Sequence, residues 1–431
     1  MKSSKFLSVM LAAIGLFVSL QSCATKNEAQ VASKGDTTIA KSPESPKSIE
    51  SPESPKSTVN SKSIKTSNQT SETSQTSLAN FDAKKSERLT DSAKFLAGMK
   101  VNDTQAIAQL TKSGSWKQHA AFFDKAWANL EAQQLSKVRK WAGKELTPIN
   151  QTSKPIFYPF SGPDFLYAYS FFPNASDYVL VGLEPVGKVP DLDKLSDSQV
   201  KTKLREVNGS MDAILGFSFF RTKAMKVDLE KQGVLPILYV FMARTNNRIL
   251  DVQYIGLDKD ANLQKLNNSS QDKSLISGVK ISFVQEGKSQ SQTLYYFSTD
   301  LSNSGLKKTP GFNKFVKKFD APVTYLKAAS YLMYNKSFSS MRNLILAQSN
   351  NLLQDDSGIP VKYFDQKKWD LAFYGTYTKP IDLFSKRYQP DLRKIYTSNK
   401  KIEPLNFGIG YKYRLNQSNL MLAIAEGKSK P

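Results

Sequence analysis

The stretch from Phe157 to Gly187 reads FYPFSGPDFLYAYSFFPNASDYVLVGLEPVG and is the densest aromatic segment of the 431-residue chain. Four prolines divide it into short pieces, because proline lacks an amide donor and restricts the residue before it. We predict a strand near Phe157, a short helix opened by Pro163 and Asp164, and a buried strand over residues 178–183. The segment therefore predicts a core that contains both helices and strands.

Upstream of this segment, three tryptophans predict a packed helix. Trp116, Trp127 and Trp141 are spaced so that one continuous helix would place all three indoles on a single stripe. Ser115 and Gln118 fit a capping box at the start of that helix. We interpret the stripe as a buried packing ridge. The alternative is an exposed aromatic row that stacks on sugars.

Downstream, the pattern predicts hairpins and then helices. Strands are expected over 237–243 and 249–255, and again over 279–284 and 293–297. Two helices are expected over 323–334 and 338–353. At the C-terminal end, the sequence GIGYKYRLNQSNLMLAIAE predicts a hairpin whose faces alternate, with Tyr411, Tyr413 and Leu415 on one side and Lys412 and Arg414 on the other.

These elements predict the α+β class rather than a doubly wound sheet, because helices and antiparallel hairpins fall in separate runs. We expect a helical N-terminal part, then antiparallel hairpins and further helices. Residues 81–431 would form a single large domain, and a division into two subdomains stays open.

The first 22 residues have the layout of a secretory signal peptide. Lys2 and Lys5 precede an apolar run from Phe6 to Leu20, and small residues follow it. The run is shorter than the roughly 20 residues that span a bilayer as a helix. We therefore predict that this segment is removed.

Residues 20–23 read LQSC and contain the single cysteine of the chain, Cys23. This motif resembles the lipobox of bacterial lipoproteins, although Gln21 departs from the usual small residue. In that family the cysteine receives a diacylglycerol and a fatty acid such as palmitate, and it becomes the new N-terminus. The resemblance implies a membrane anchor at Cys23, and Ala24 in place of aspartate favours the outer over the inner membrane. An ordinary signal peptide with a chance cysteine is the alternative.

Residues 23–80 are predicted to be the lipidated cysteine followed by a disordered tether. Residues 24–80 contain 13 Ser, 8 Thr and no aromatic residue, so they cannot bury enough apolar surface to offset the entropy of ordering. The heptapeptide SPESPKS occurs twice, over 42–48 and 51–57, and spaced prolines favour extended conformations. The repeats could instead be a motif for a proline-binding partner.

The folded part is basic. The chain has 60 Lys and Arg against 38 Asp and Glu, and residues 81–431 keep 51 against 32, a net charge of +19. Export argues against nucleic acid as the partner. The anions outside the cytoplasm are lipid headgroups, lipopolysaccharide and acidic glycans, which a basic surface would attract. The alternative is that scattered lysines only keep the protein soluble.

The segment GFNKFVKKFD, residues 311–320, predicts a short amphipathic helix. Its phenylalanines and Val316 share one side, and Lys314, Lys317 and Lys318 lie opposite. This pattern is typical of a helix on an anionic membrane, so these lysines are our candidates for membrane or anion contact. A helix packed on the domain with solvated lysines is the alternative.

Few residues are suited to catalysis. His119 is the single histidine and is expected to be structural, and with no cysteine besides Cys23 we predict neither a metal site nor a cofactor. The catalytic candidates are four carboxylates, which could hydrolyse glycosidic bonds if two of them meet. For Asp355 and Asp356, the formation of a turn is the alternative explanation. The four are Asp164, Glu184, Asp355 and Asp356.

The segments SGPDFL with GLEPVG, LLQDDSG, and FGIGY followed by SNLMLA resemble a recurring set in uncharacterised bacterial exported proteins. The resemblance covers much of residues 155–425 and implies no activity. We therefore predict a lipid-anchored cell-envelope protein that binds or scaffolds anionic components rather than catalyses a reaction. A carboxylate-dependent hydrolase of an envelope or extracellular polysaccharide is the alternative.

Overall fold

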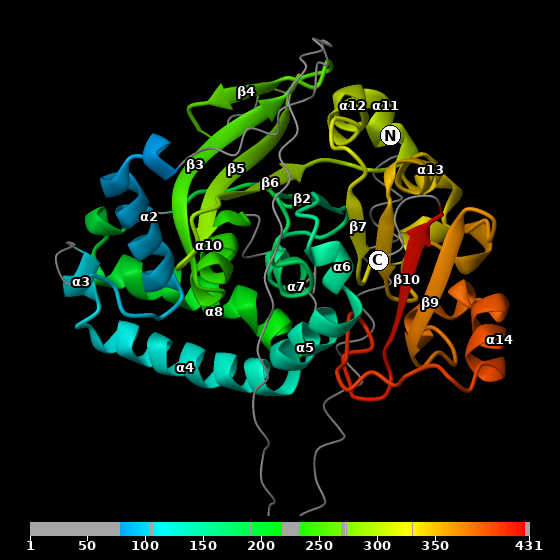
Figure 1. The fold of residues 1–431 in the computed structure, drawn as a ribbon. Coiled ribbons are helices and arrows are strands. Elements are labelled where there is room, and N and C mark those ends of the chain that lie inside the picture. The colour runs from blue at the N-terminus through cyan, green and yellow to red at the C-terminus, as the bar shows by residue number, and fades with distance from the viewer. Residues whose placement is uncertain are drawn as a thin grey trace, which may run out of the picture. The chain divides into compact units, whose positions relative to one another are not determined.

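A ten-stranded sheet runs through the computed structural model, in the order β4-β3-β5-β6-β2-β1-β7-β8-β10-β9 (Figure 1). The structure describes residues 78–102, 107–189, 191–217, 233–268, 272, 274–329 and 331–426. The strands are β1 Ile156–Tyr158, β2 Asp177–Gly182, β3 Asn247–Leu257, β4 Leu263–Leu266, β5 Ile276–Gln285, β6 Gln292–Ser298, β7 Val323–Leu326, β8 Asn351–Gln354, β9 Trp369–Gly375 and β10 Asn419–Ala425.

Helices surround this sheet, so the predicted α+β class is confirmed. The α-helices are α2 Ala83–Leu96, α3 Ile107–Leu110, α4 Gly114–Leu130, α5 Ser136–Glu145, α6 Thr147–Asn150, α7 Phe165–Phe171, α8 Asp197–Phe217, α10 Leu235–Arg244, α11 Asn303–Lys308, α12 Pro310–Val316, α13 Ser339–Gln348 and α14 Pro390–Ser398. The short 3-10 helices include η1 Leu78–Asn80, η3 Leu192–Lys194, η4 Leu332–Tyr334, η6 Val361–Tyr363 and η7 Asp382–Arg387.

The middle of the sheet is parallel and its two arms are antiparallel. Strands β6, β2, β1, β7 and β8 run in one direction, with Ile156 opposite both Tyr178 and Val323. Strands β4, β3 and β5 form one antiparallel arm and β10 with β9 the other. The predicted antiparallel pairing holds for the β5–β6 hairpin, whereas the parallel centre was not predicted.

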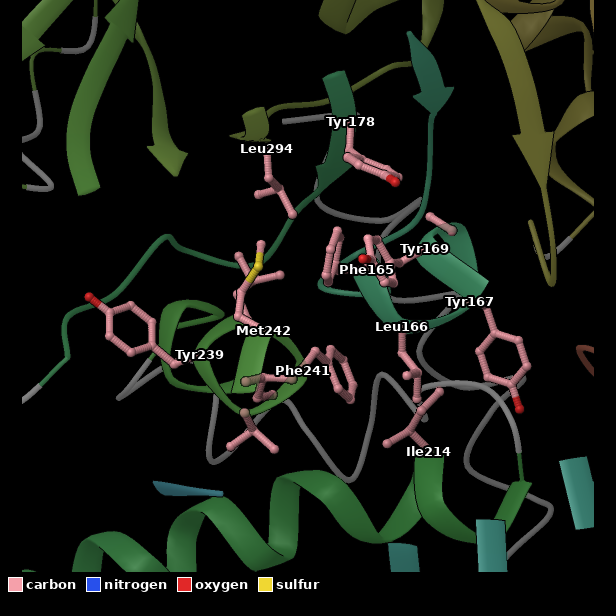
Figure 2. Close-up of a cluster of buried hydrophobic side chains, with 14 of the residues drawn as sticks. Phe165, Leu166, Tyr167, Tyr169, Tyr178, Ile214, Tyr239, Phe241, Met242 and Leu294 are labelled. Atoms are coloured by element: carbon pink, nitrogen blue, oxygen red, sulfur yellow. The ribbon is translucent and has the colours of Figure 1, made fainter. Parts of the chain in front are cut away.

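Side chains alternate along the strands and so build two cores, one on each face of the sheet. Tyr178 and Leu180 of β2 face the larger core, which packs against α2, α4, α5, α7, α8 and α10. Val179 and Val181 face the smaller core, which packs against α11, α12 and α13. Figure 2 shows part of the larger core, where side chains of α7 and α10 meet those of the sheet.

The segment that begins at Phe157 folds as predicted. It forms β1, then α7, then β2. Asp164 caps α7, because the Tyr167 amide donates to Asp164 Oδ1 at 3.3 Å. In the larger core the Phe165 ring packs edge-on against Tyr178, with centroids 5.2 Å apart.

The tryptophan ridge is also confirmed. Helix α4 continues into α5 through a π-helical turn, Glu131–Leu135. Trp127 is buried, while Trp116 and Trp141 are partly buried against the same core, so they do not form an exposed row. The predicted capping residue, Ser115, is wrong by two positions, because the Trp116 amide donates to Ser113 Oγ at 3.2 Å.

Two downstream predictions are wrong, and a third is wrong in its C-terminal end. Residues 237–243, expected as a strand, lie in α10. The helix expected over 323–334 starts instead with the four-residue strand β7. The helix expected over 338–353 ends at Gln348, and β8 follows it.

The C-terminal hairpin is likewise not formed. The last strand, β10, pairs with β8 and β9 and not with the residues just before it. The expected first strand contributes an isolated bridge between Ile409 and Lys412. Residues 408–412 instead form a loop that reaches the carboxyl end of β8, as described below.

All of the described residues belong to one compact unit. Within the described residues, no helix has both the length and the apolar character that a membrane span requires.

Candidate functional site

The carboxyl ends of β1, β7 and β8 meet at one edge of the sheet. The crossover from β1 to β2 passes through α7 on the larger core, and the crossover from β7 to β8 passes through α13 on the smaller core. The two crossovers leave the centre in opposite directions, so the strand order switches between β1 and β7. In open sheets of parallel strands, ligands bind outside the carboxyl ends at such a point.

An ion pair occupies this switch point. Lys327, the residue after β7, places Nζ 2.6 Å from Asp164 Oδ2. The Tyr158 hydroxyl donates to the same carboxylate oxygen at 3.0 Å, and the Lys327 ammonium lies 3.6 Å from the centre of the Tyr167 ring. Burial raises the pKa of Asp164 and lowers the pKa of Lys327. Mutual attraction between the two buried charges therefore has to offset their desolvation.

Asp355 lies beside this pair, directly after β8. Its Oδ1 accepts from the Ser357 amide and its Oδ2 from the Ala328 amide, both at 3.0 Å. Burial, together with the neighbouring Asp356 carboxylate, raises the pKa of Asp355 to about 6. The loop 408–412 closes over it at Gly410, which has a φ of +56° and where a Cβ would collide with Asp355 Oδ2.

Asp356 is held from three directions. Its Oδ1 lies 3.1 Å from Lys412 Nζ and accepts from Asn419 Nδ2 at 3.0 Å. Its Oδ2 accepts from the Tyr331 hydroxyl at 2.8 Å. We call the group Asp164, Lys327, Asp355, Asp356 and Lys412 the carboxylate cluster.

Glu184 is the fourth predicted carboxylate and lies after the neighbouring strand, β2. The Tyr296 hydroxyl donates to the Glu184 carbonyl at 2.8 Å. The Glu184 carboxylate covers Gly182, where a Cβ would collide with it. Among the described residues, no hydrogen bond or ion pair joins Glu184 to the carboxylate cluster. The structure therefore brings three of the four candidates together.

The cluster is closed to large substrates in this conformation. Asp164, Asp355 and Asp356 are 2%, 5% and 6% exposed, and each carboxylate already has hydrogen-bond partners. Hydrolysis of a glycosidic bond requires the sugar to lie between two carboxyl groups. Asp355 has a raised pKa and lies beside a second carboxylate, Asp356, in a different environment. Such a pair is nevertheless the pattern that supports acid–base chemistry. As it stands, the cluster ties together the loops that follow β1, β7 and β8.

The predicted amphipathic helix is α12. Its apolar residues Phe312, Phe315 and Val316 are buried in the smaller core, which is the packing alternative given above. Lys314 Nζ bonds Asp260 Oδ1 at 3.0 Å, and Lys318 Nζ donates to the Ala261 carbonyl. Both lysines thus rest on the turn between β3 and β4.

Three further lysines near α12 are exposed: Lys307 and Lys308 in the last turn of α11, and Lys317 directly after α12. Within the described ranges none of the three forms an ion pair. We call Lys307, Lys308, Lys314, Lys317 and Lys318 the lysine surface. Contact between this surface and an anion stays a prediction.

His119 has the structural role that was expected of it. It is buried on α4, and its Nε2 donates to the Leu96 carbonyl at 2.8 Å. Burial lowers its pKa, and its ring packs on Phe123 with centroids 4.8 Å apart. The imidazole therefore joins α4 to the end of α2.

Other sequence predictions concern residues that the structure does not describe. Cys23, the signal peptide and the tether up to residue 77 lie outside the described residues, so they stay predictions. Among the described residues, no group of three or more His, Cys, Asp or Glu side chains is placed to hold a metal ion.

The basic members of the carboxylate cluster were missed from sequence. Lys327 follows the apolar run VTYL of β7, just as Asp355 follows the run NLLQ of β8. A polar residue directly after each of two buried strands was the available signal, and it was hidden because both strands were read as helices. Lys412 was assigned to a hairpin face.

Comparison with known proteins adds no relative. No protein-family model, no curated protein and no solved structure matches the chain.

Proposed function

We propose that the protein is a lipid-anchored component of the bacterial cell envelope whose folded part binds an anionic envelope component through the lysine surface. The observation that carries this proposal is that residues 307–318 hold five lysines, of which Lys307, Lys308 and Lys317 are exposed and form no ion pair within the described part of the chain. Each such lysine contributes about 1 kcal/mol when it lies close to an anionic surface.

The backbone beneath these lysines is held in place. The side chains of Phe312 and Phe315 are buried, and the Phe315 and Phe297 rings pack edge-on with centroids 5.1 Å apart. A Cβ at Gly311 would collide with the Asp258 carbonyl, so α12 lies directly on the turn between β3 and β4. The charges are therefore presented on a fixed platform, and little further ordering is needed when an anion binds.

The anchor rests on the lipobox resemblance at Cys23. We expect the full chain to incorporate radioactive palmitate when it is expressed in a bacterial cell, because the diacylglycerol is attached through the cysteine sulfur. The variant Cys23→Ala removes that sulfur and should carry no label. Label that persists in Cys23→Ala would contradict the anchor.

Vesicle binding tests the lysine surface. The chain from Ala24 onward lacks the anchor, and it should sediment with phosphatidylglycerol vesicles and be released as salt rises to about 0.5 M. Replacing Lys307, Lys308 and Lys317 by Gln should weaken binding by at least about tenfold, since three charges near the surface are lost.

A matched control distinguishes binding at the lysine surface from a general effect of the protein's net charge. Lys386, Lys394 and Lys400 are also exposed, and in the described chain they too form no ion pair. Replacing these three by Gln changes the net charge equally and should leave vesicle binding within about twofold. Equal losses in the two triple variants would mean that the lysine surface is not the binding site.

The polysaccharide hydrolase is the second candidate. The raised pKa of Asp355 next to Asp356 favours it, and the burial of both carboxylates weighs against it. Release of reducing sugars from an envelope polysaccharide, lost in Asp356→Asn, would move it to first place.

A further inference from the structure

A pocket of about 360 Å³ lies between α2, α10 and β3, away from both the carboxylate cluster and the lysine surface. Its volume suits a small molecule. The aliphatic part of its lining comes from six different elements or loops: Leu89, Ile107, Val189, Leu192, Leu235 and Val252. A ligand with a hydrocarbon part would be desolvated against this wall.

An incompletely bonded carboxylate also lines the pocket. Asp91 of α2 is 4% exposed. Its Oδ1 accepts from the Asn102 amide at 3.3 Å, and its buried Oδ2 has no hydrogen-bond partner. Burial raises the pKa of Asp91. An unsatisfied buried acceptor is costly, so a donor that reached Oδ2 would recover that free energy.

Tyr239 provides a second polar group. Its ring leaves α10 on the side away from Phe241 (Figure 2) and reaches the pocket. Burial and the nearby Tyr254 and Asp251 raise its pKa, so the hydroxyl is neutral. Among the described residues no hydrogen-bond partner of this hydroxyl is present, and it can accept from a ligand.

The two cations at the pocket are already neutralised. Lys85 forms an ion pair with Asp251, and Arg88 Nη2 lies 2.7 Å from Asp191 Oδ1. Asp191 also pairs with Lys194, whose Nζ lies 2.8 Å from Asp191 Oδ2, so the lining carboxylate left without an ion pair is that of Asp91. This unpaired carboxylate favours a monocation and disfavours an anion.

We propose that this pocket binds an alkylammonium ion, whose nitrogen donates to Asp91 Oδ2 and Tyr239 Oη and whose hydrocarbon chain lies against the aliphatic wall. A primary ammonium has three donors and no acceptor, which matches two acceptors on one side of an apolar cavity. The ion is carried both by free amines and by lysine side chains of peptides. This inference is independent of the lysine surface.

Calorimetric titration of the chain from Ala24 onward tests the proposal with three probes of one shape. Hexylamine, hexanol and hexanoate differ in their polar end, and at pH 7.5 we expect hexylamine to bind at least about tenfold more tightly than hexanol. Hexanoate should give no binding. Equal affinities for the three, or no binding of hexylamine, would overturn the proposal.

Two variants assign the polar contacts. Asp91→Asn keeps the shape of the side chain and the hydrogen bond from the Asn102 amide. It should weaken hexylamine binding at least about tenfold and leave the affinity for hexanol unchanged. Tyr239→Phe removes only the hydroxyl and should weaken it about threefold. The control Asp382→Asn removes an exposed carboxylate elsewhere and should have no effect. Unchanged hexylamine binding in Asp91→Asn would refute the site even if Tyr239→Phe reduced it.

The source of the ammonium is distinguished by a fourth probe, Nα-acetyl-lysinamide. Tighter binding of this probe than of hexylamine would support a lysine side chain of a peptide as the ligand. Weaker binding would support a free amine. Either result supports the proposal only if Asp91→Asn also weakens binding of the probe.

Discussion

Two of the regions that bury aspartates differ in the partners that these side chains have. In the carboxylate cluster, Asp355 accepts from two backbone amides and Asp356 meets a lysine and a tyrosine. In the pocket beside α2, Asp91 Oδ2 has no partner. The contrast separates two kinds of buried charge, since satisfied carboxylates join segments of the fold while an unsatisfied one leaves an acceptor for the ligand that we propose.

The largest expected effect lies in the cluster. Lys327→Met removes the ammonium and leaves Asp164 buried without its counter-ion, so we expect the free energy of unfolding to fall by about 3–5 kcal/mol. Urea denaturation followed by circular dichroism measures this change.

The matched variant at the pocket is Arg88→Met. It also removes a cation from an ion pair, but Arg88 and Asp191 are both exposed, so its unfolding midpoint should stay within experimental error. If the two variants lost equal stability, the distinction between a satisfied, sealed cluster and an open pocket would not hold.

A smaller effect is expected from pH. The pKa of Asp355 is about 6 in the folded protein and about 3.9 in an unfolded chain, so between these values the folded state binds more protons. The stability contributed by this group is therefore lost as pH rises from about 4 to about 6, by at most about 3 kcal/mol. Asp355→Asn cannot titrate, and it should gain stability relative to the unmodified protein over that interval.

Chemical denaturation of both proteins at several pH values checks this expectation. The difference between their unfolding free energies should change with pH in the stated direction and become constant above about pH 7. A difference that is independent of pH would show that Asp355 titrates normally. The cluster would then be less tightly sealed than its contacts indicate.

Local sequence signals predicted an element correctly where a proline or a capping residue marks its start. The segment from Phe157 onward was predicted correctly because Pro163 and Asp164 mark the start of α7 and the apolar run after Asp177 has the length of a strand. The alternation around Gly287 likewise gave β5 and β6.

Sequence reasoning failed where an element is buried on all sides. Helix α10 reads LPILYVFMAR and is apolar around its whole circumference, so its period does not distinguish it from a strand. Pro236, in its first turn, was the overlooked helix signal. Strands β7 and β8 have four residues each, too few to establish a period.

The candidate site was recovered in part for a related reason. Asp164 was recognised as the residue that opens a short helix, and Asp355 and Asp356 as adjacent carboxylates in a turn. Their partners Lys327 and Lys412 were not recognised, because these contacts depend on the parallel order of β1, β7 and β8. Strand order is set by contacts between residues distant in the chain, which local patterns do not contain. The Asp91 pocket was missed for the same reason.

Helix α2 has a mechanical consequence. The Ser86 hydroxyl donates to the Ile249 carbonyl at 2.7 Å, and the Ile249 amide donates to Thr90 Oγ1 at 3.1 Å, so two bonds fasten the helix to β3. The same helix supplies Asp91 and Arg88 to the pocket. A load that slid α2 along β3 would have to break both bonds and would deform the pocket. A bound ligand would resist that load, which couples tension on the chain to occupancy of the pocket.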